Sequence, residues 1–175
     1  EKNIEAAYSL NAEAPKKLAE EAEKNNSLLV HYSTDYVFDG LSGAYKEEDT
    51  VNPQSVYGKS KQKGEEYIRN SGCNHLILRT SWVYGVYRNN FYLTMCRLAK
   101  EHEEIRVVND QMGCPTWSFL IALATSQILG QEKAYAQSKS GTYHLCSSGS
   151  ASWYYFAREI LKDTSAKITP ITTSE

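Results

Sequence analysis

The stretch from Ser33 to Lys61, STDYVFDGLSGAYKEEDTVNPQSVYGKSK, sets the expected fold, because it joins the end of a predicted strand to the start of a predicted helix. Tyr57 and Lys61 stand four residues apart, so on a helix they share one face and can reach the same bound atom. A neighbouring ammonium favours the phenolate form of a tyrosine and lowers its pKa towards neutral pH. The pair therefore predicts a site that moves a proton.

The Tyr-x-x-x-Lys spacing is weak evidence by itself, because Tyr135 and Lys139 repeat it. That second pair lies between two glycines, and no predicted strand with hydroxyl side chains at its end precedes it. We therefore interpret it as a chance match. The first pair follows an apolar run, Leu28–Val30, which leads into Ser33 and Thr34. Sites in open α/β sheets lie at the carboxyl ends of the strands. The alternative for the first pair is a solvated helix face.

Composition restricts the class of protein. With 175 residues the chain is long enough for one core. Its 19 basic residues are scattered among 21 acidic ones, which argues against a nucleic-acid partner. No apolar run approaches the roughly 20 residues that span a bilayer, so we expect a soluble, cytoplasmic protein. Cysteines and histidines lack metal-ligand spacing, and we assign no metal. Because the chain begins at Glu1 and not at methionine, we expect a part of a longer protein.

Strand and helix signals alternate along the chain, which predicts a doubly wound α/β domain. Gly58 and Gly64 interrupt the helix that carries Tyr57, which suggests close approach to another surface. Pro15 is expected to kink or restart the first helix, and Asn11 either hydrogen-bonds beside a site or marks a boundary. Strands are predicted at residues 27–33, 75–80, 105–108 and 142–146, and helices at 4–25, 53–72, 88–103, 118–129 and 152–161.

Seven motifs connect these elements to a known family. In chain order they are AAYSLNAEAPKKLAEEA, STDYVFDG, YGKSKQKGE, LRTSWVYG, NNFYLTM, DQMGCPT and GTYHLCSSGSASWYYFAREIL. Together they resemble the extended short-chain dehydrogenase/reductase family, in the branch that reduces dTDP-4-dehydro sugars. The resemblance implies a mostly parallel Rossmann-like sheet. Within it, residues 1–103 would form the second half of the Rossmann-like domain and residues 104–175 mainly the substrate-binding part.

The chain departs from the family at its start, because it contains no Gly-x-Gly-x-x-Gly or Gly-x-x-Gly-x-x-Gly motif. That motif forms the turn that holds the pyrophosphate of a dinucleotide against a helix N-terminus. We therefore expect the sheet to be incomplete in its N-terminal half. The main phosphate-binding part for NADPH or NADH would then lie outside these residues.

The resemblance assigns roles to particular residues. Tyr57 would donate a proton to the C4 oxygen of the sugar, and Thr34 would hydrogen-bond that reacting oxygen. Lys61 would hold the nicotinamide ribose and lower the pKa of Tyr57. Tyr36 would contact the cofactor; the alternative is an aromatic side chain that merely ends the strand.

Two further residues would contact the sugar nucleotide. Asp35, together with the preceding threonine, would touch the substrate directly. Trp82 would pack against it; the alternative is a tryptophan of the core. In related dehydratases an Asp-Glu pair follows that threonine, whereas here Asp35 precedes Tyr36, which leaves carbonyl reduction as the natural chemistry.

The resemblance implies NAD(P)H-dependent reduction of the C4 ketone of dTDP-4-dehydro-L-rhamnose to dTDP-L-rhamnose, a precursor of cell-surface polysaccharide. It allows a homodimer and implies neither a membrane nor a nucleic acid as partner. Another sugar-nucleotide reductase or epimerase of the family remains an alternative. So does a non-catalytic relative such as the regulatory subunit of methionine adenosyltransferase.

Overall fold

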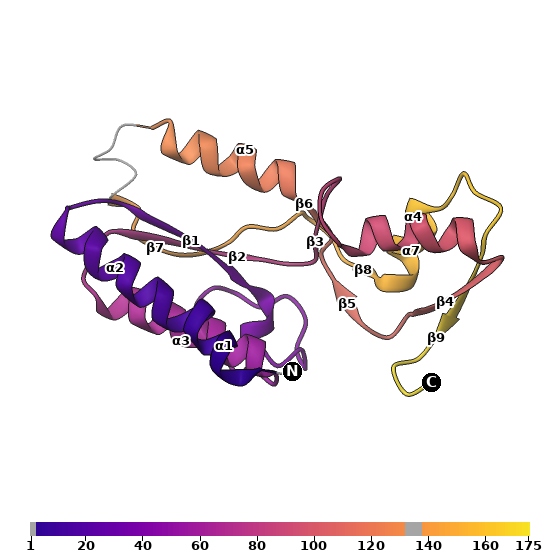
Figure 1. Cartoon of the computed structure of the whole chain (residues 1–175), viewed down its shortest axis with the longest axis horizontal. Coiled ribbons are helices and arrows are strands. Elements are labelled where there is room, and N and C mark those ends of the chain that lie inside the picture. The colour runs from indigo at the N-terminus through magenta and orange to yellow at the C-terminus, as the bar shows by residue number, and fades with distance from the viewer. Residues whose placement is uncertain (1–2, 132–137) are drawn as a thin grey trace. The chain divides into compact units, whose positions relative to one another are not determined.

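A computed structural model describes residues 3–131 and 138–175, and it has the expected α/β fold with mostly parallel strand pairing (Figure 1). The chain divides into two compact units. The first comprises Glu1–Thr80 and Thr125–Leu145, and the second comprises Ser81–Ala124 and Cys146–Glu175. The expected division lay at residue 103. In the structure, residues 81–103 belong to the same compact unit as most of the later chain. The assignment of residues 1–103 to the Rossmann-like domain and of residues 104–175 mainly to substrate binding stays a prediction.

A parallel sheet in the order β1-β2-β7 forms the centre of the first unit. Its strands are β1 (Leu29–Thr34), β2 (His75–Thr80) and β7 (Gly141–His144). The register places Leu29 beside His75 and Thr34 beside Thr80, so the first two strands end together. Figure 1 shows α2 (Ala14–Lys24) and α3 (Val56–Asn70) along one face of this sheet. Ala19, Ile68 and Ile77 form the buried core between these layers.

The first helix is interrupted close to Pro15, as the sequence predicts. α1 (Ile4–Tyr8) passes into a π-helical turn, η1 (Ser9–Glu13), before α2 begins. Proline lacks an N–H and cannot donate to the carbonyl four residues earlier, which is that of Asn11. Gly64 of α3 lies against this carbonyl, because an added Cβ there would come within 2.1 Å of it. The Asn11 side chain donates to Ser60 Oγ at 3.0 Å, so this asparagine ties the first helices to α3.

α3 begins later than predicted. Asn52 and Pro53 were the expected start, but the N-cap is Ser55, whose Oγ accepts from the Gly58 N–H at 3.0 Å. The Asn52 side chain lies in the preceding loop, where its Nδ2 donates to Asp39 at 3.0 Å. This contact instead ties the long 38–52 loop together.

The second unit contains three separate strand pairs. β3 (Val83–Tyr84) and β6 (Thr116–Trp117) are parallel, as are β4 (Glu104–Val108) and β9 (Lys167–Ile171), whereas β5 (Met112–Gly113) and β8 (Ala151–Ser152) are antiparallel. The helices α4 (Phe91–Glu101) and α7 (Trp153–Ile160) supply its core with the β4 strand. That core consists of Met95, Ile105, Val107, Ala157 and Leu161.

Two helices of the later chain agree with the sequence at three of their boundaries. α5 (Ser118–Leu129) has the predicted limits. Ser152 caps α7, as predicted, by accepting the Tyr155 N–H at 3.1 Å. The DQMGCPTW segment, in contrast, was expected to be a loop and contains the two short strands β5 and β6.

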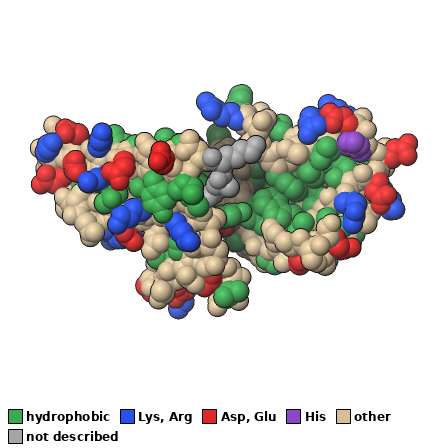
Figure 2. Space-filling view, turned by 60° about the horizontal axis from the view of Figure 1, so that its bottom comes forward, with side chains coloured by type: hydrophobic (Ala, Val, Ile, Leu, Met, Phe, Trp, Pro, Cys, Tyr) green, Lys and Arg blue, Asp and Glu red, His purple; other side chains and the backbone are tan. Residues whose placement is uncertain are grey.

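On the surface, acidic and basic side chains are interspersed over the face seen in Figure 2. This mixing accords with the small net charge of −2. Among the described residues, no helix combines the length and apolar character needed to cross a bilayer. Tyr135 of the second Tyr-x-x-x-Lys match lies outside the described residues.

Candidate functional site

The predicted site begins where β1 ends. Thr34 is 5% exposed and caps the short 3-10 helix η2 (Asp35–Val37). Its Oγ1 accepts from the Tyr36 N–H at 3.2 Å and donates to Asp35 Oδ1 at 3.2 Å. The hydroxyl is thus held at the carboxyl end of β1, the position predicted from the sequence.

Tyr57 lies in the first turn of α3 and faces this strand end. Its ring packs edge-on against that of Tyr36, with centroids 5.9 Å apart and planes at 73°. Its hydroxyl shares a hydrogen bond with the side chain of Thr34. This close approach requires glycine at position 58, since a Cβ there would lie 2.2 Å from the Tyr36 carbonyl oxygen. Gly58 therefore confirms the expected close contact of α3 with another surface.

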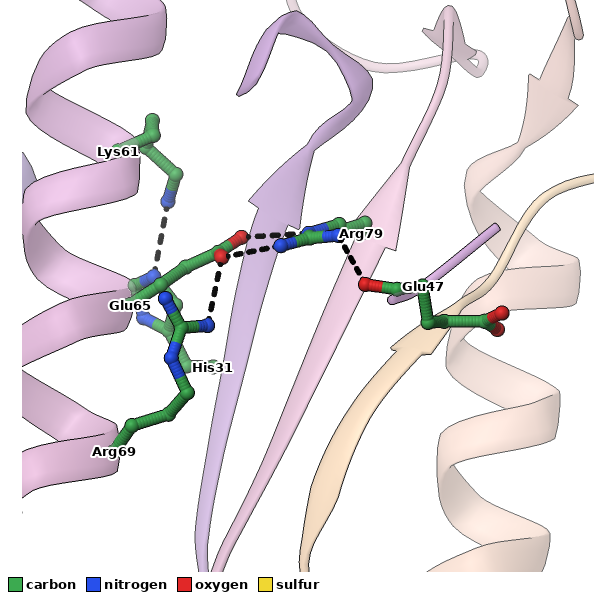
Figure 3. A network of polar contacts seen from close by, with 6 residues as sticks. All are labelled: His31, Glu47, Lys61, Glu65, Arg69 and Arg79. Atoms are coloured by element: carbon green, nitrogen blue, oxygen red, sulfur yellow. Dashed lines mark hydrogen bonds and ion pairs between the residues drawn. The ribbon is translucent and has the colours of Figure 1, made fainter. Parts of the chain in front are cut away.

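Lys61, one turn further along α3, points at β1 (Figure 3). Its Nζ donates to the Tyr32 carbonyl oxygen at 2.6 Å and lies 3.2 Å from His31 Nε2. Only 8% of Lys61 is exposed. The two residues of the predicted pair therefore share one face of α3, but the ammonium is held by the strand.

The electrostatics differ from the expectation for the pair. Partial burial raises the pKa of Tyr57, and the charge of Asp35 and the neighbouring Tyr36 raise it further, whereas the Thr34 hydrogen bond lowers it. The pKa of Lys61 is lowered, mainly by burial, although Glu65 opposes that shift. The expected lowering of the Tyr57 pKa by Lys61 is therefore wrong for this structure. The physical reason is that burial of the phenol dominates the shift, while the Lys61 ammonium donates to the Tyr32 carbonyl oxygen of β1.

The remaining predicted residues of the first unit lie beside this pair. Tyr36 is 50% exposed, and burial, followed by the charge of Asp35, raises the pKa of its phenol. Thr34, Asp35, Tyr36, Tyr57 and Lys61 are thus brought together by one strand end and one helix. Trp82, the other predicted site residue, belongs to the second unit.

A buried ion network behind Lys61 was missed by the sequence reasoning (Figure 3). Arg79 of β2 binds Glu65 of α3 in a two-pronged contact, Nε to Oε1 at 3.0 Å and Nη2 to Oε2 at 2.8 Å. Arg69 adds a bond to the same carboxylate at 3.0 Å, and Arg79 also donates to the Glu47 carbonyl at 3.2 Å. A signal was present, because Tyr57, Lys61, Glu65 and Arg69 recur every four residues along one face of α3.

Trp82 is held tightly within the second unit. Its ring stacks on that of Trp153, with centroids 3.4 Å apart and planes at 5°. An added Cβ at Gly113 would lie 2.2 to 2.6 Å from three atoms of the same ring. Because a ring stacked this closely fills one face of the indole, the Gly113 backbone must lie over the other. Trp82 also has a positive φ of 43°, which is strained for a tryptophan.

This packing makes a prediction for stability. Replacing Trp82 with alanine should lower the melting temperature, because both faces of a half-buried indole lose their partners. The cost should lie somewhat below the roughly 3 to 5 kcal/mol of a fully buried tryptophan. Trp117→Ala is the matched control, since Trp117 is 39% exposed and should cost less. Thermal melts of both variants decide, and equal losses would contradict the assigned packing.

Comparison with known proteins places the chain in a family. A family model described as the RmlD substrate binding domain matches residues 1–175. The dTDP-4-dehydrorhamnose reductase of Aggregatibacter actinomycetemcomitans is 45% identical over 173 residues, which cover 95% of this chain and 57% of that protein. The spore coat polysaccharide biosynthesis protein SpsK of Bacillus subtilis is 39% identical over 100% of this chain and 60% of its own length.

Solved structures agree with this placement. The dTDP-4-dehydrorhamnose reductase of Bacillus anthracis, in complex with NADP, matches with a TM-score of 0.91 and 37% identity over 98% of this chain and 60% of that one. The corresponding protein of Clostridium acetobutylicum gives a TM-score of 0.89 with 41% identity, again over 98% and 60%. This chain spans between 52% and 61% of the length of the curated relatives that it matches. Because the family model matches all 175 residues, the chain belongs to the RmlD substrate binding domain family.

Proposed function

We propose that this chain carries the proton-donating and sugar-binding part of an NAD(P)H-dependent reductase that converts dTDP-4-dehydro-L-rhamnose to dTDP-L-rhamnose. The observation that carries the proposal is the Tyr57 hydroxyl beside Thr34, with Lys61 one turn further along the same helix. The names of the relatives, dTDP-4-dehydrorhamnose reductases, supply the reaction and the sugar. Since the chain spans only part of their length, we propose the activity for a full-length protein that contains these residues.

Tyr57 is the proton donor of the proposed reaction. Its raised pKa keeps the phenol protonated at neutral pH, which is the form that a reduction needs. Thr34, which lies beside Tyr57, can exchange the hydrogen bond that it donates to Asp35 for one to a carbonyl oxygen bound at the strand end. The two groups together stabilise negative charge that develops on that oxygen and then neutralise it with a proton.

The other residues bind and orient. Lys61 would hold the nicotinamide ribose, because its ammonium has three N–H donors and β1 uses two of them. Tyr36, half-exposed beside Tyr57, would contact the cofactor, and Asp35 would contact the sugar nucleotide. Trp82 would contact the substrate through the edge of its ring, since both faces are covered within its own unit.

The residues present fit one end of the implied cofactor. Lys61, Tyr57 and Tyr36 can bind a ribose and a ring, and NADPH or NADH, when bound, supplies the hydride. The sequence contains no Gly-x-Gly-x-x-Gly motif for the pyrophosphate, so we expect these residues to hold only the nicotinamide end of the dinucleotide. We also propose a cytoplasmic location. The same proposal includes a homodimer, which the resemblance allows.

The proposal is tested by an assay of the full-length protein with dTDP-4-dehydro-L-rhamnose and either NADPH or NADH. We expect sugar-dependent oxidation of the dinucleotide and formation of dTDP-L-rhamnose. Interconversion of two sugar nucleotides without consumption of the dinucleotide would identify an epimerase instead. A protein that binds the dinucleotide but turns over no sugar would point to a non-catalytic relative.

A separate prediction concerns these 175 residues expressed alone. They should show no measurable binding of NADPH or NADH, because the remaining contacts reach only the nicotinamide end. Those few hydrogen bonds must also offset a loss of translational and rotational freedom of at least about 4 kcal/mol. Calorimetric titration beside the full-length protein is the measurement. Micromolar binding by the shorter chain would show that the pyrophosphate site lies within it.

A further inference from the structure

The position of the Lys61 ammonium is set by β1, and one of its two partners there is a side chain. Nζ lies 2.6 Å from the Tyr32 carbonyl oxygen and 3.2 Å from His31 Nε2. Any residue at position 32 supplies the backbone carbonyl. The second partner, in contrast, needs a side chain with a hydrogen-bond acceptor at position 31. His31 lies on the α3 side of β1, since successive side chains of a strand alternate between its faces, and the Tyr32 hydroxyl bonds Thr125 instead, at 2.8 Å.

We propose that His31 is a positioning residue for Lys61: its imidazole accepts a hydrogen bond from the buried ammonium and, with the Tyr32 carbonyl, fixes the direction of the third N–H. That third donor is the one available to a ligand. The inference rests on the proposed function only for its catalytic consequence. The contact itself belongs to the structure whatever the substrate proves to be.

The charge state of His31 suits this role. Burial, followed by the charge of Lys61, lowers its pKa to about 4, and Glu65 opposes the shift. At neutral pH the ring is therefore uncharged, and Nε2 can accept while Nδ1 carries the proton. Lys61 and Glu65 of α3 are the titratable groups that act on the ring within the described part of the chain. A charged imidazole would have no acceptor and would repel the ammonium.

The contact also bears on the charge of Lys61. A buried ammonium is destabilised by loss of water, and each hydrogen bond that it donates opposes that effect. Burial already lowers the pKa of Lys61. Removal of the imidazole acceptor should lower it further and let the ammonium swing away from its present direction.

The test compares two variants of the full-length protein. His31→Leu removes the acceptor and keeps an apolar side chain, whereas His31→Gln keeps a carbonyl acceptor on a chain of similar reach. His75→Gln is the control, because His75 bonds the Cys73 carbonyl at 2.9 Å and has no contact with Lys61. The readouts are the pKa of Lys61, followed by NMR of lysine labelled with ¹³C at Cε, and the kinetic constants kcat and KM.

We expect His31→Leu to lower the Lys61 pKa and to reduce kcat by about ten- to a hundredfold, the effect of losing a hydrogen bond to a charged group. His31→Gln should restore both, and His75→Gln should change neither. An unchanged Lys61 pKa in His31→Leu would overturn the inference. So would equal effects in the leucine and glutamine variants, which would show a merely structural role.

The proposed reductase function and the positioning role of His31 can be disproved independently of each other. If the wild-type protein has no reductase activity, the proposed function is wrong, and the NMR titration still reports whether His31 holds Lys61. If the wild-type protein is active but His31→Leu leaves kcat and the Lys61 pKa unchanged, the function stands and the positioning role is wrong.

Discussion

Replacement of Tyr57 by phenylalanine in the full-length protein is expected to lower turnover of dTDP-4-dehydro-L-rhamnose by about two to four orders of magnitude, the usual contribution of a positioned proton donor. The ring should keep its packing against Tyr36, because only the hydroxyl is removed. Folding and cofactor affinity should therefore change little. The effect should appear in kcat and not in the melting temperature.

The pH dependence of the reaction should reveal the same group. Because the pKa of Tyr57 is raised above its ordinary value of 10.0, the phenol is protonated through the neutral range, and activity should fall as the pH rises through that raised value. Tyr57→Phe should lose this alkaline limb along with most of its rate. A wild-type rate that rises with pH through the neutral range would mean that the phenolate is the active form.

Tyr67→Phe is the matched control for this variant. Tyr67 lies on the same helix, and its ring contacts the ammonium groups of Lys16 and Lys63, away from the strand end. Loss of its hydroxyl should leave kcat within about twofold of wild type, as for a group outside the site. Steady-state rates decide between the variants. A Tyr57→Phe rate within about threefold of wild type would refute the assignment of the proton donor.

The fold was largely predictable because its signals are local. The apolar run before Ser33, the four-residue spacing of Tyr57 and Lys61, and the two helix glycines each predicted a feature that the structure contains. Gly58 and Gly64 are informative for a physical reason: each faces a carbonyl oxygen too closely for any side chain. The strand-end cluster of Thr34 with Tyr57 followed from the same pattern.

Features that depend on distant partners were not predictable in this way. β9 was missed because Pro170 stands inside it, and proline argues against a strand unless the strand lies at an edge, as β9 does in its two-stranded pair. The start of α3 was misplaced because Ser55, three residues after Asn52, supplies the capping oxygen that accepts from the Gly58 N–H. The pKa of Tyr57 depends on burial, which no spacing reveals. The partner of Glu65, Arg79, comes from another strand and was likewise hidden.

The last expected result concerns that pair. Glu65→Ala in the full-length protein should reduce the free energy of unfolding by about 3 to 5 kcal/mol, the cost of breaking a buried ion pair by removing one partner. Glu65 is fully buried and Arg79 is 4% exposed. The variant would leave the Arg79 guanidinium without its two-pronged acceptor between α3 and β2. Urea unfolding followed by circular dichroism is the measurement.

The matched control is an exposed pair of the same residue types. Arg97 and Glu101 stand four apart on α4, with side chains 59% and 47% exposed. Glu101→Ala should cost no more than about 1 kcal/mol, because solvent screens the charges and the pair loses side-chain entropy when it forms. Similar losses in Glu65→Ala and Glu101→Ala would show that burial does not strengthen the inner pair.

The same pair predicts a loss of stability in acid. Burial raises the pKa of Glu65, but the hydrogen bonds and charge of Arg79, with help from Arg69, outweigh it, so the pKa lies below its ordinary value of 4.5. A carboxyl group whose pKa is lower in the folded state stabilises the fold above the unfolded value, and this contribution disappears as pH falls through the folded pKa. Wild-type stability should therefore decline below about pH 4.5. Glu65→Ala lacks the titrating group and should show a shallower decline, and parallel acid curves for the two proteins would mean that other carboxyl groups govern the loss.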